Sequence, residues 1–317
     1  MAGLGGLNIT HTEPADQFIA RYAASAPALT PMIKAFTPDH LRQWCAELGE
    51  PTFVGTSGRV FPESFKASPL LRAWLAKLDR QGVELRNRHR WLGWDEDGAL
   101  LFQMGAGETL TFEASATVLA LGGATWPRLG STGAWKAALA ERGVELSPFA
   151  PSNCGFEVAW SDRLIDQHEG KPLKNVGFHF GEHNSRAEAV ITKRGLEGGA
   201  VYALSAPLRD AIAAEGPQTL MLDLVPDLSL EETAAKLAKA KAKDSLSNRL
   251  RKALGLSDVQ RALYFEGHGP GGKEDLAQAV KSVPIQLLKP FGLDRAISSD
   301  GGVAWEAVDS DLQLEAI

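Results

Sequence analysis

The sequence predicts an α/β protein, α+β overall, in which a mostly antiparallel domain with a helical lobe interrupts a first domain. A short apolar run, Val118–Leu121, stops at two glycines, which is typical of a strand buried on both faces of a parallel sheet. After Pro148 and Pro151 the pattern changes to alternating, half-exposed strands. We therefore expect a first domain over residues 1–149, continued by 295–317, and an inserted domain over 150–294, with the lobe at about 229–288.

The composition is that of a water-soluble globular chain. A length of 317 residues suggests roughly two domains of about 150 residues each. The net charge is −6 and no basic face is visible, which argues against a nucleic-acid partner. Two cysteines without ligand spacing fit a reducing cytoplasm, and no apolar run is long enough to span a membrane. We expect a cytoplasmic protein that acts on a small-molecule substrate, with no membrane partner; its oligomeric state stays open.

Paired glycines follow the Val118–Leu121 run, and a Gly-Ser-Thr-Gly turn comes after them. Glycines at the end of a strand let the backbone approach a ligand, because no Cβ intrudes. Ser131 or Thr132 can cap a helix that runs through Trp135, and the amino end of that helix can receive an anion. The alternative is a strand, a turn and a capped helix that bind nothing, since one glycine-rich turn is a weak signal.

Two other glycine-rich stretches have the composition of ligand loops. The chain opens with Gly3, Gly5, Gly6 and Asn8 within its first ten residues, which is typical of an interior loop; a flexible leader is the alternative. Residues 55–62 form a second loop, with an arginine and an aromatic residue.

Regular elements are expected between these loops. Helical periodicity covers residues 14–49 and Pro69–Gln81, and a meander of strand-like pieces covers residues 83–112, with a turn at Asp95–Gly98. In the inserted domain, Ser229 and Glu232 form a capping box at the start of a Lys- and Ala-rich helix.

Several common catalytic patterns are missing from the sequence. There is no G-x-G-x-x-G after a strand, no Walker loop and no G-x-S-x-G elbow. His179 and His183 lie four residues apart, but the pattern around them favours a strand, so we expect no metal site. The catalytic residues are therefore unknown, which is typical of an enzyme whose cofactor carries the chemistry.

Five motifs in order resemble the aminoacetone-oxidase-like (BaiN-type) FAD-binding flavoproteins. They span essentially the whole chain: residues 1–11 (MAGLGGLNITH), 57–62 (SGRVFP), 119–127 (LALGGATWP), 191–199 (ITKRGLEGG) and 299–303 (SDGGV). The resemblance implies an incomplete two-dinucleotide-binding-type domain, FAD as the cofactor, and a bacterial oxidoreductase.

The chain also departs from the family pattern. The family begins with a βαβ unit that carries G-x-G-x-x-G and ends with a glycine-rich strand-to-helix segment; both are missing here, so the chain looks truncated at both ends. Gly122 stands where the family more usually has Thr. Because the missing unit supplies backbone donors to the pyrophosphate, we expect this chain to retain FAD only weakly.

The matching motifs imply the cofactor-binding residues. Gly5, Gly6 and Asn8 would lie beside the flavin or its ribityl chain. Gly58, Arg59 and Phe61 would line the isoalloxazine side; the alternative for Arg59 is a plain surface charge. Leu121, Gly122 and Gly123 would approach the adenosine–pyrophosphate part, and Trp91 would meet adenine through its backbone.

The resemblance thus favours a flavin-dependent oxidoreductase that oxidises or reduces a small substrate. A truncated, non-catalytic remnant or binding protein that no longer holds the cofactor is the alternative, and a nicotinamide-dependent enzyme is a third possibility.

Overall fold

The computed structural model describes residues 6–105, 107–241, 243–271 and 275–316. The chain divides into two compact units, which we call the first unit (Met1–Trp91 with Leu101–Thr111) and the second unit (Leu92–Leu100 with Phe112–Ile317). The boundaries expected near residues 150 and 294 stay a prediction.

The first unit contains a small antiparallel sheet and short helices. The strand order is β1-β3-β2. Helix α3 starts where it does because the Thr37 side chain accepts from the N–H of His40, while the His40 ring accepts from the N–H of Thr37. The predicted helix at 69–81 is confirmed as α4. The elements of this unit are β1 (Thr10–His11), α1 (Ala15–Ala20), η1 (Ala23–Ser25), α2 (Ala26–Ala35), α3 (Pro38–Glu47), β2 (Thr52–Val54), β3 (Arg59–Pro62) and α4 (Ala67–Arg80).

The predicted meander is a three-stranded sheet in the order β4-β5-β6. Its strands are β4 (His89–Trp94), β5 (Leu100–Met104) and β6 (Glu108–Phe112). The turn at Asp95 is confirmed: the Asp95 carboxylate accepts from the N–H groups of Asp97 and Ala99. The first piece of the expected meander, Val83–Arg86, is not a strand, and Glu84 and Arg86 pair with each other at the surface.

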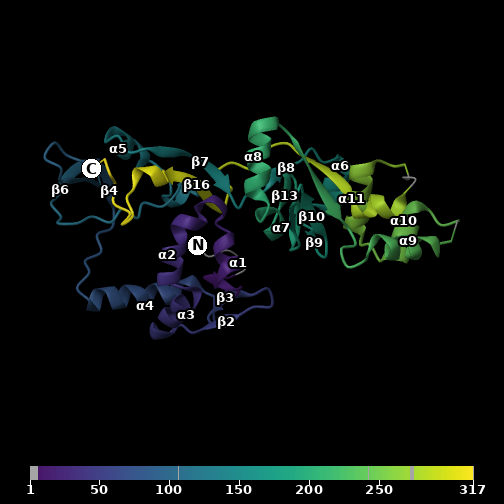
Figure 1. Ribbon diagram of the computed structural model, residues 1–317, viewed down its shortest axis with the longest axis horizontal. Coiled ribbons are helices and arrows are strands. Elements are labelled where there is room, and N and C mark those ends of the chain that lie inside the picture. Colours follow the sequence, from purple (N-terminus) through teal and green to yellow (C-terminus); the bar gives the residue numbers. More distant parts are fainter. Residues whose placement is uncertain (1–5, 106, 242, 272–274, 317) are drawn as a thin grey trace. The chain divides into compact units, whose positions relative to one another are not determined.

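Two four-stranded antiparallel sheets form the centre of the second unit, in the orders β8-β13-β12-β9 and β11-β10-β14-β15. A two-stranded antiparallel ribbon, β7 with β16, lies outside both (Figure 1). The strands are β7 (Leu146–Ser152), β8 (Phe156–Glu157), β9 (Pro172–Leu173), β10 (Gly177–Phe180), β11 (His183–Ser185), β12 (Ala189–Thr192), β13 (Gly195–Glu197), β14 (Gln218–Asp223), β15 (Val283–Leu287) and β16 (Ser298–Val303). These antiparallel sheets and the mixed helices confirm the predicted α+β composition.

Helices of the second unit begin at well-formed caps. The predicted capping box at Ser229 and Glu232 is confirmed, and Ser257 with Gln260 forms another. The helices are η2 (Pro127–Leu129), α5 (Lys136–Glu141), α6 (Asp162–His168), α7 (Gly199–Tyr202), α8 (Ser205–Glu215), α9 (Leu230–Ala238), α10 (Leu246–Leu254), α11 (Asp258–His268), α12 (Leu276–Lys281) and η3 (Trp305–Ala307). One continuous hydrophobic core, whose members run from Cys154 to Ala296, joins the sheets to these helices.

The central prediction of a buried strand at Val118–Leu121 is wrong. Residues 113–125 form no strand, and Val118 is 91% exposed. A buried strand needs hydrogen-bonded neighbours on its edges. Residues 118–121 pair with no described strand, so their apolar character and β propensity alone do not make them a strand.

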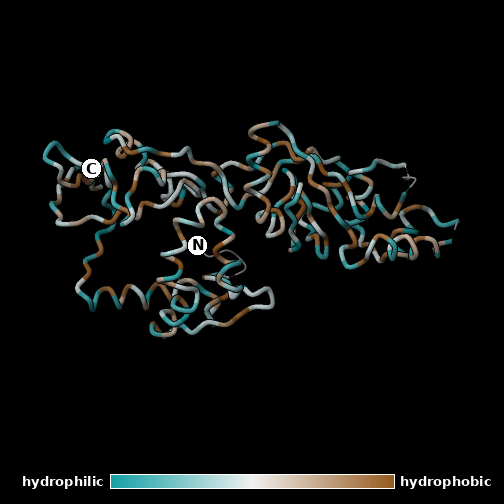
Figure 2. The backbone as a smooth tube through the Cα atoms, viewed as in Figure 1, coloured by the Kyte–Doolittle hydropathy of each residue, from teal (hydrophilic) through white to brown (hydrophobic). Residues whose placement is uncertain are grey.

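Hydrophobic residues are distributed along the chain in short stretches. Figure 2 shows brown hydrophobic segments interleaved with teal hydrophilic ones. Within the described residues, no helix combines the length and the apolar character needed to cross a bilayer.

A largely buried ion pair ties α12 to the end of β14. Lys281 Nζ lies 2.7 Å from an Asp223 carboxylate oxygen and also donates to the carbonyl oxygens of Val225 and Leu228. The other Asp223 oxygen accepts from the N–H of Val225 at 2.9 Å. Removing one partner of such a pair leaves an uncompensated charge away from water.

Lys281→Met should therefore lower the free energy of unfolding by about 3 kcal/mol. Lys289→Met is the matched control: the Lys289 side chain is 65% exposed and pairs with Glu157 at 3.4 Å, so its loss should change the free energy by less than about 0.5 kcal/mol. Urea unfolding followed by circular dichroism measures both. Equal effects of the two substitutions would contradict a structural role for the Lys281 pair.

Candidate functional site

The β7–β16 ribbon contains a bulge that only glycine fits. The register shifts between Asp300 and Gly302, where Gly301 has φ +87° and Gly302 has φ +118°. A Cβ on Gly301 would lie 2.1 Å from the carbonyl oxygen of Pro148. The paired glycines therefore allow β16 to bend closely against β7.

Residues 122–125 lie against strand β16 of this ribbon, although Ala124 and Ser299 are 175 residues apart in sequence. The N–H of Ala124 donates to Ser299 Oγ at 3.1 Å. A Cβ on Gly123 would lie 1.9 Å from the same oxygen, so Gly123 leaves the space that this hydroxyl occupies. The glycine pair after the apolar run and the Ser-Asp-Gly-Gly motif near the end of the sequence thus meet at one place.

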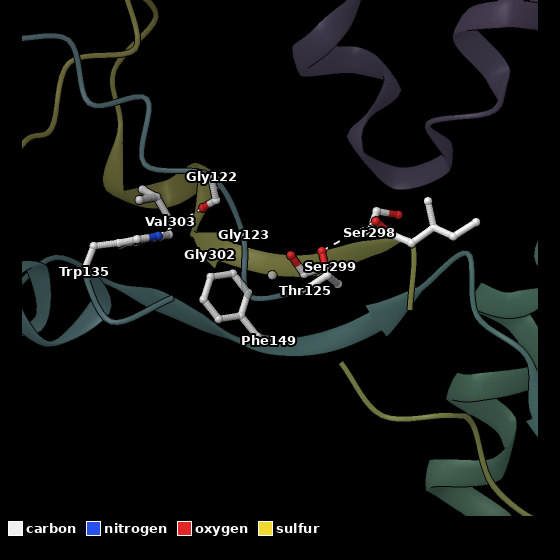
Figure 3. A pocket seen from close by; sticks show the side chains of 11 residues that line it. Gly122, Gly123, Thr125, Trp135, Phe149, Ser298, Ser299, Gly302 and Val303 are labelled. Carbon is white, nitrogen blue, oxygen red and sulfur yellow. Dashed lines mark hydrogen bonds between the residues drawn. The ribbon is translucent and has the colours of Figure 1, made fainter. Parts of the chain in front are cut away.

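A pocket of about 430 Å³ opens where they meet (Figure 3). One wall comes from residues 122, 123 and 125, and another from residues 297–299 and 301–303. Trp135 and Phe149 add two aromatic rings, packed edge to face with centroids 5.6 Å apart. Trp135 Nε1 donates to the carbonyl oxygen of Gly122 at 3.0 Å, which ties the ring to the glycine wall. The volume is in the range of small-molecule sites, about 300–1,000 Å³.

The lining of the pocket is polar but uncharged. Its side chains are hydroxyl, aromatic and aliphatic, and none of the lining residues is ionisable. The N–H groups of Gly122 and Gly123 donate to no acceptor among the described residues. Such a site offers backbone donors and aromatic surface to a ligand, and it supplies no acid or base of its own.

The helix predicted next to this turn begins later than expected and lacks the predicted side-chain cap. Helix α5 begins at Lys136 and has six residues, and no side chain caps it. Thr132 Oγ1 instead accepts from the N–H of Ala134 at 3.4 Å. Gly133 takes φ +63°, and a Cβ there would lie 2.5 Å from the Phe149 ring. These residues therefore form a turn against Phe149, and the anion site expected at the amino end of the helix stays a prediction.

A second group of predicted site residues lies in the first unit. Strand β1 pairs with β3 so that His11 faces Arg59. A Cβ on Gly58, whose φ is +78°, would lie 2.8 Å from the His11 ring. The His11 ring is held at both nitrogens: Nδ1 accepts from the N–H of Glu13 and Nε2 lies 2.9 Å from the Ser57 carbonyl oxygen. Gly58 thus makes room for a fixed imidazole.

The other predicted residues of the first unit have distinct roles. Asn8 Nδ2 donates to the Thr10 carbonyl oxygen at 2.9 Å and so shapes its own loop. Phe61 stacks on Phe65 with centroids 5.5 Å apart, and a Cβ on Gly6 would lie 2.6 Å from the Phe65 ring. Arg59 is exposed and forms no ion pair with described residues. Arg59 therefore remains available to a ligand, whereas Phe61 is occupied by aromatic packing.

The remaining predicted positions are scattered. Trp91 lies on β4, and Leu121 lies in the extended segment before the pocket. Gly5 lies outside the described residues. Leu121 does not line the pocket, although Gly122 and Gly123 do.

Reactive thiols and metal ligands are not part of the pocket. Burial raises the pKa of the Cys154 thiol to about 11, and burial also raises the pKa of Cys45. Both sulfurs are inaccessible to solvent, as expected for small buried hydrophobic side chains. Among the described residues, no group of His, Cys, Asp or Glu side chains is arranged to hold a metal ion.

The fold and the pocket define an α+β protein with an uncharged pocket lined by glycines and aromatic rings. The chain belongs to the family described as HI0933-like protein Rossmann domain, whose model matches residues 1–316. This is a dinucleotide-binding Rossmann family.

The close approach of Gly123 to Ser299 can be tested by a double-mutant cycle. Gly123→Ala should displace the Ser299 hydroxyl and break its hydrogen bond to Ala124, lowering the free energy of unfolding by about 1–3 kcal/mol. In a Ser299→Ala background, the atom nearest to a Cβ on residue 123 is the Cβ of residue 299, at 3.3 Å. Gly123→Ala should therefore lower the free energy of unfolding much less in that background. Additive effects in thermal unfolding would contradict this contact.

Proposed function

We propose that this protein is a flavoprotein that binds FAD and acts as an oxidoreductase on a small molecule, in the manner of aminoacetone-oxidase-like (BaiN-type) enzymes. The observation that carries the proposal is the pocket itself. Two motifs of the flavoprotein resemblance, residues 119–127 and 299–303, together build its glycine walls.

The uncharged lining fits part of a dinucleotide. Free N–H groups at Gly122 and Gly123 can donate to oxygen acceptors of a pyrophosphate or sugar, without a side chain between them. Trp135 offers a ring that an aromatic base can pack against. When bound, the flavin supplies hydride and electron transfer; the residues of this chain bind and orient it.

Residues of the first unit are the second group proposed to contact FAD. Arg59 carries an exposed positive charge beside the glycine turn at Gly58. A guanidinium donates to oxygen acceptors, which the isoalloxazine ring offers as its carbonyl oxygens, so Arg59 is proposed to face the isoalloxazine side. Asn8, Gly6 and Phe61 support this loop through the contacts described above.

A non-catalytic binding protein is the second candidate, and one observation favours it. No residue that lines the pocket is ionisable, so nothing at this site performs acid–base chemistry unless a cofactor or the substrate contributes it.

The proposed setting is the cytoplasm, with a small-molecule substrate and with no nucleic-acid or membrane partner.

Ligand titrations test the function. Equilibrium dialysis up to high ligand concentration should show saturable binding of FAD and of ADP to the chain. FAD and ADP should each bind more tightly than NAD. Trp135→Phe removes the hydrogen bond to Gly122 and should weaken ADP binding about tenfold, equivalent to about 1.4 kcal/mol. Trp160→Phe is the matched control, because its indole also donates to a backbone carbonyl, that of Gly195, outside this pocket.

Several outcomes would contradict the proposal. Absence of saturable FAD and ADP binding would remove the nucleotide site, and tighter binding of NAD would favour a nicotinamide-dependent enzyme. Equal loss of affinity in both tryptophan variants would place the ligand elsewhere. If no amine or other small substrate reduces the bound FAD under anaerobic conditions, so that its absorbance does not fall, the result would favour the non-catalytic binding protein.

A further inference from the structure

Helix α8 contacts the pocket ribbon through two side chains one turn apart. Ser205 and Arg209 are four residues apart and therefore share one face of the helix. Ser205 is 2% exposed, and its Oγ accepts from the N–H of Asn153 at 3.1 Å. The Asn153 side chain in turn donates to Ser298 Oγ at 2.6 Å, on the first residue of β16. The first side chain thus fixes the end of the ribbon where the two strands begin to pair.

The second side chain, Arg209, reaches both strands of the ribbon. Its side chain is 11% exposed, and its guanidinium donates to the carbonyl oxygen of Pro151 in β7 at 3.2 Å and pairs with the Asp300 carboxylate in β16 at 2.8 Å. Its Nε donates to Asp210 on the outer side. Burial alone would lower the pKa of Arg209, but the carboxylates of Asp210 and Asp300 raise it above its ordinary value. The guanidinium is therefore a fixed, charged cross-link between α8, β7 and β16.

Asp300 transmits this cross-link to the glycine bulge. One of its oxygens pairs with Arg209, and the other accepts from the N–H of Gly301 at 2.9 Å. Gly301 and its neighbour Gly302 line the pocket, and neither has a side chain that could hold its backbone in place. Gly302 lies under the Trp135 ring, which a Cβ at this position would approach to 3.6 Å.

We propose that Arg209 is a positioning residue, which acts through Asp300 to set the backbone of Gly301 and Gly302 in the pocket wall. The consequence for ligand affinity rests on the proposed function, because it requires the pocket to be the nucleotide site. The positioning itself concerns only the protein and can be tested without a ligand. Glycines with positive φ have several accessible conformations, so a charged anchor outside the pocket narrows them to one.

The experiment compares two carboxylates on opposite sides of the same guanidinium. Asp300→Asn weakens the link to the bulge, whereas Asp210→Asn weakens the outer pair; both side chains are more than half exposed, at 56% and 66%. Arg209→Met removes the cross-link, and Arg209→Lys keeps the positive charge and so part of the cross-link. Arg295→Met is the control for losing an arginine that pairs with Glu197 away from the pocket.

Two readouts are measured for each variant. The first is the amide chemical shifts of Gly301 and Gly302 in ¹⁵N-TROSY spectra without ligand, and the second is the dissociation constant for ADP. Arg209→Met and Asp300→Asn should each shift the amide signals of Gly301 and Gly302 and weaken ADP binding about tenfold. The variant that combines the two substitutions should lose no further affinity for ADP. Arg209→Lys should recover part of the affinity, and Asp210→Asn and Arg295→Met should leave both readouts unchanged.

The outcomes separate this inference from the proposed function. Unchanged Gly301 and Gly302 amides in Asp300→Asn, or equal changes in Asp210→Asn, would overturn the positioning role whatever the protein binds. Shifted amides in a chain that binds neither ADP nor FAD would support the positioning role and overturn the proposed function. If Arg209→Met does not fold, the comparison of the two aspartate variants decides the matter.

Discussion

The bulge in β16 is the constraint on which the candidate site depends. Strand β7 approaches so closely that a Cβ on Gly301 would lie 2.1 Å from the backbone of Pro148. This approach brings Ser299 under residues 122–125, where its hydroxyl accepts from Ala124 and fills the space beside Gly123. Without two adjacent glycines the ribbon would straighten, and the two halves of the pocket would lose their contact.

The chemistry of the pocket follows from the same constraint. Because glycine backbone forms much of the wall, the site offers N–H groups and aromatic edges and no charged side chain. Asp300 and Arg209 pair with each other on the α8 side of the ribbon, and the Lys136 ammonium lies 4.8 Å from the centroid of the Phe149 ring and donates to the carbonyl oxygen of Ser147. A pocket with such a wall favours ligands that match its shape and carry hydrogen-bond acceptors.

Local signals predicted those parts of the fold that local interactions determine. The capping box at Ser229, the amphipathic helix α4 and the turn at Asp95 depend on residues a few positions apart, and all are present. The strand at Val118–Leu121 was wrong because a strand depends on neighbours that its own sequence does not contain. The pattern predicts a helix cap at Ser131 or Thr132, but Gly133 forms a turn against Phe149, which lies seventeen residues after Thr132.

The candidate site shows the same difference between features set by local sequence and features set by long-range contacts. Gly122 and Gly123 were recognisable because paired glycines after an apolar run indicate close backbone approach, and the pocket contains both. Residues 299–303 were noticed as a motif, but nothing in the sequence placed them beside residues 122–125. Phe149, Trp135 and Arg209 were missed as site residues: an aromatic residue between prolines, one at a helix start and an arginine inside a helix have no distinctive local pattern, and their roles come from long-range contacts.

The most direct test of the account is a crystal structure of the chain with ADP or FAD. The account predicts electron density for the adenosine–pyrophosphate part in the pocket that Gly122, Trp135 and Gly302 help to line, with an oxygen of the ligand within hydrogen-bond distance of the N–H groups of Gly122 and Gly123. Density for the bound nucleotide at another place, with this pocket filled only by solvent, would contradict it.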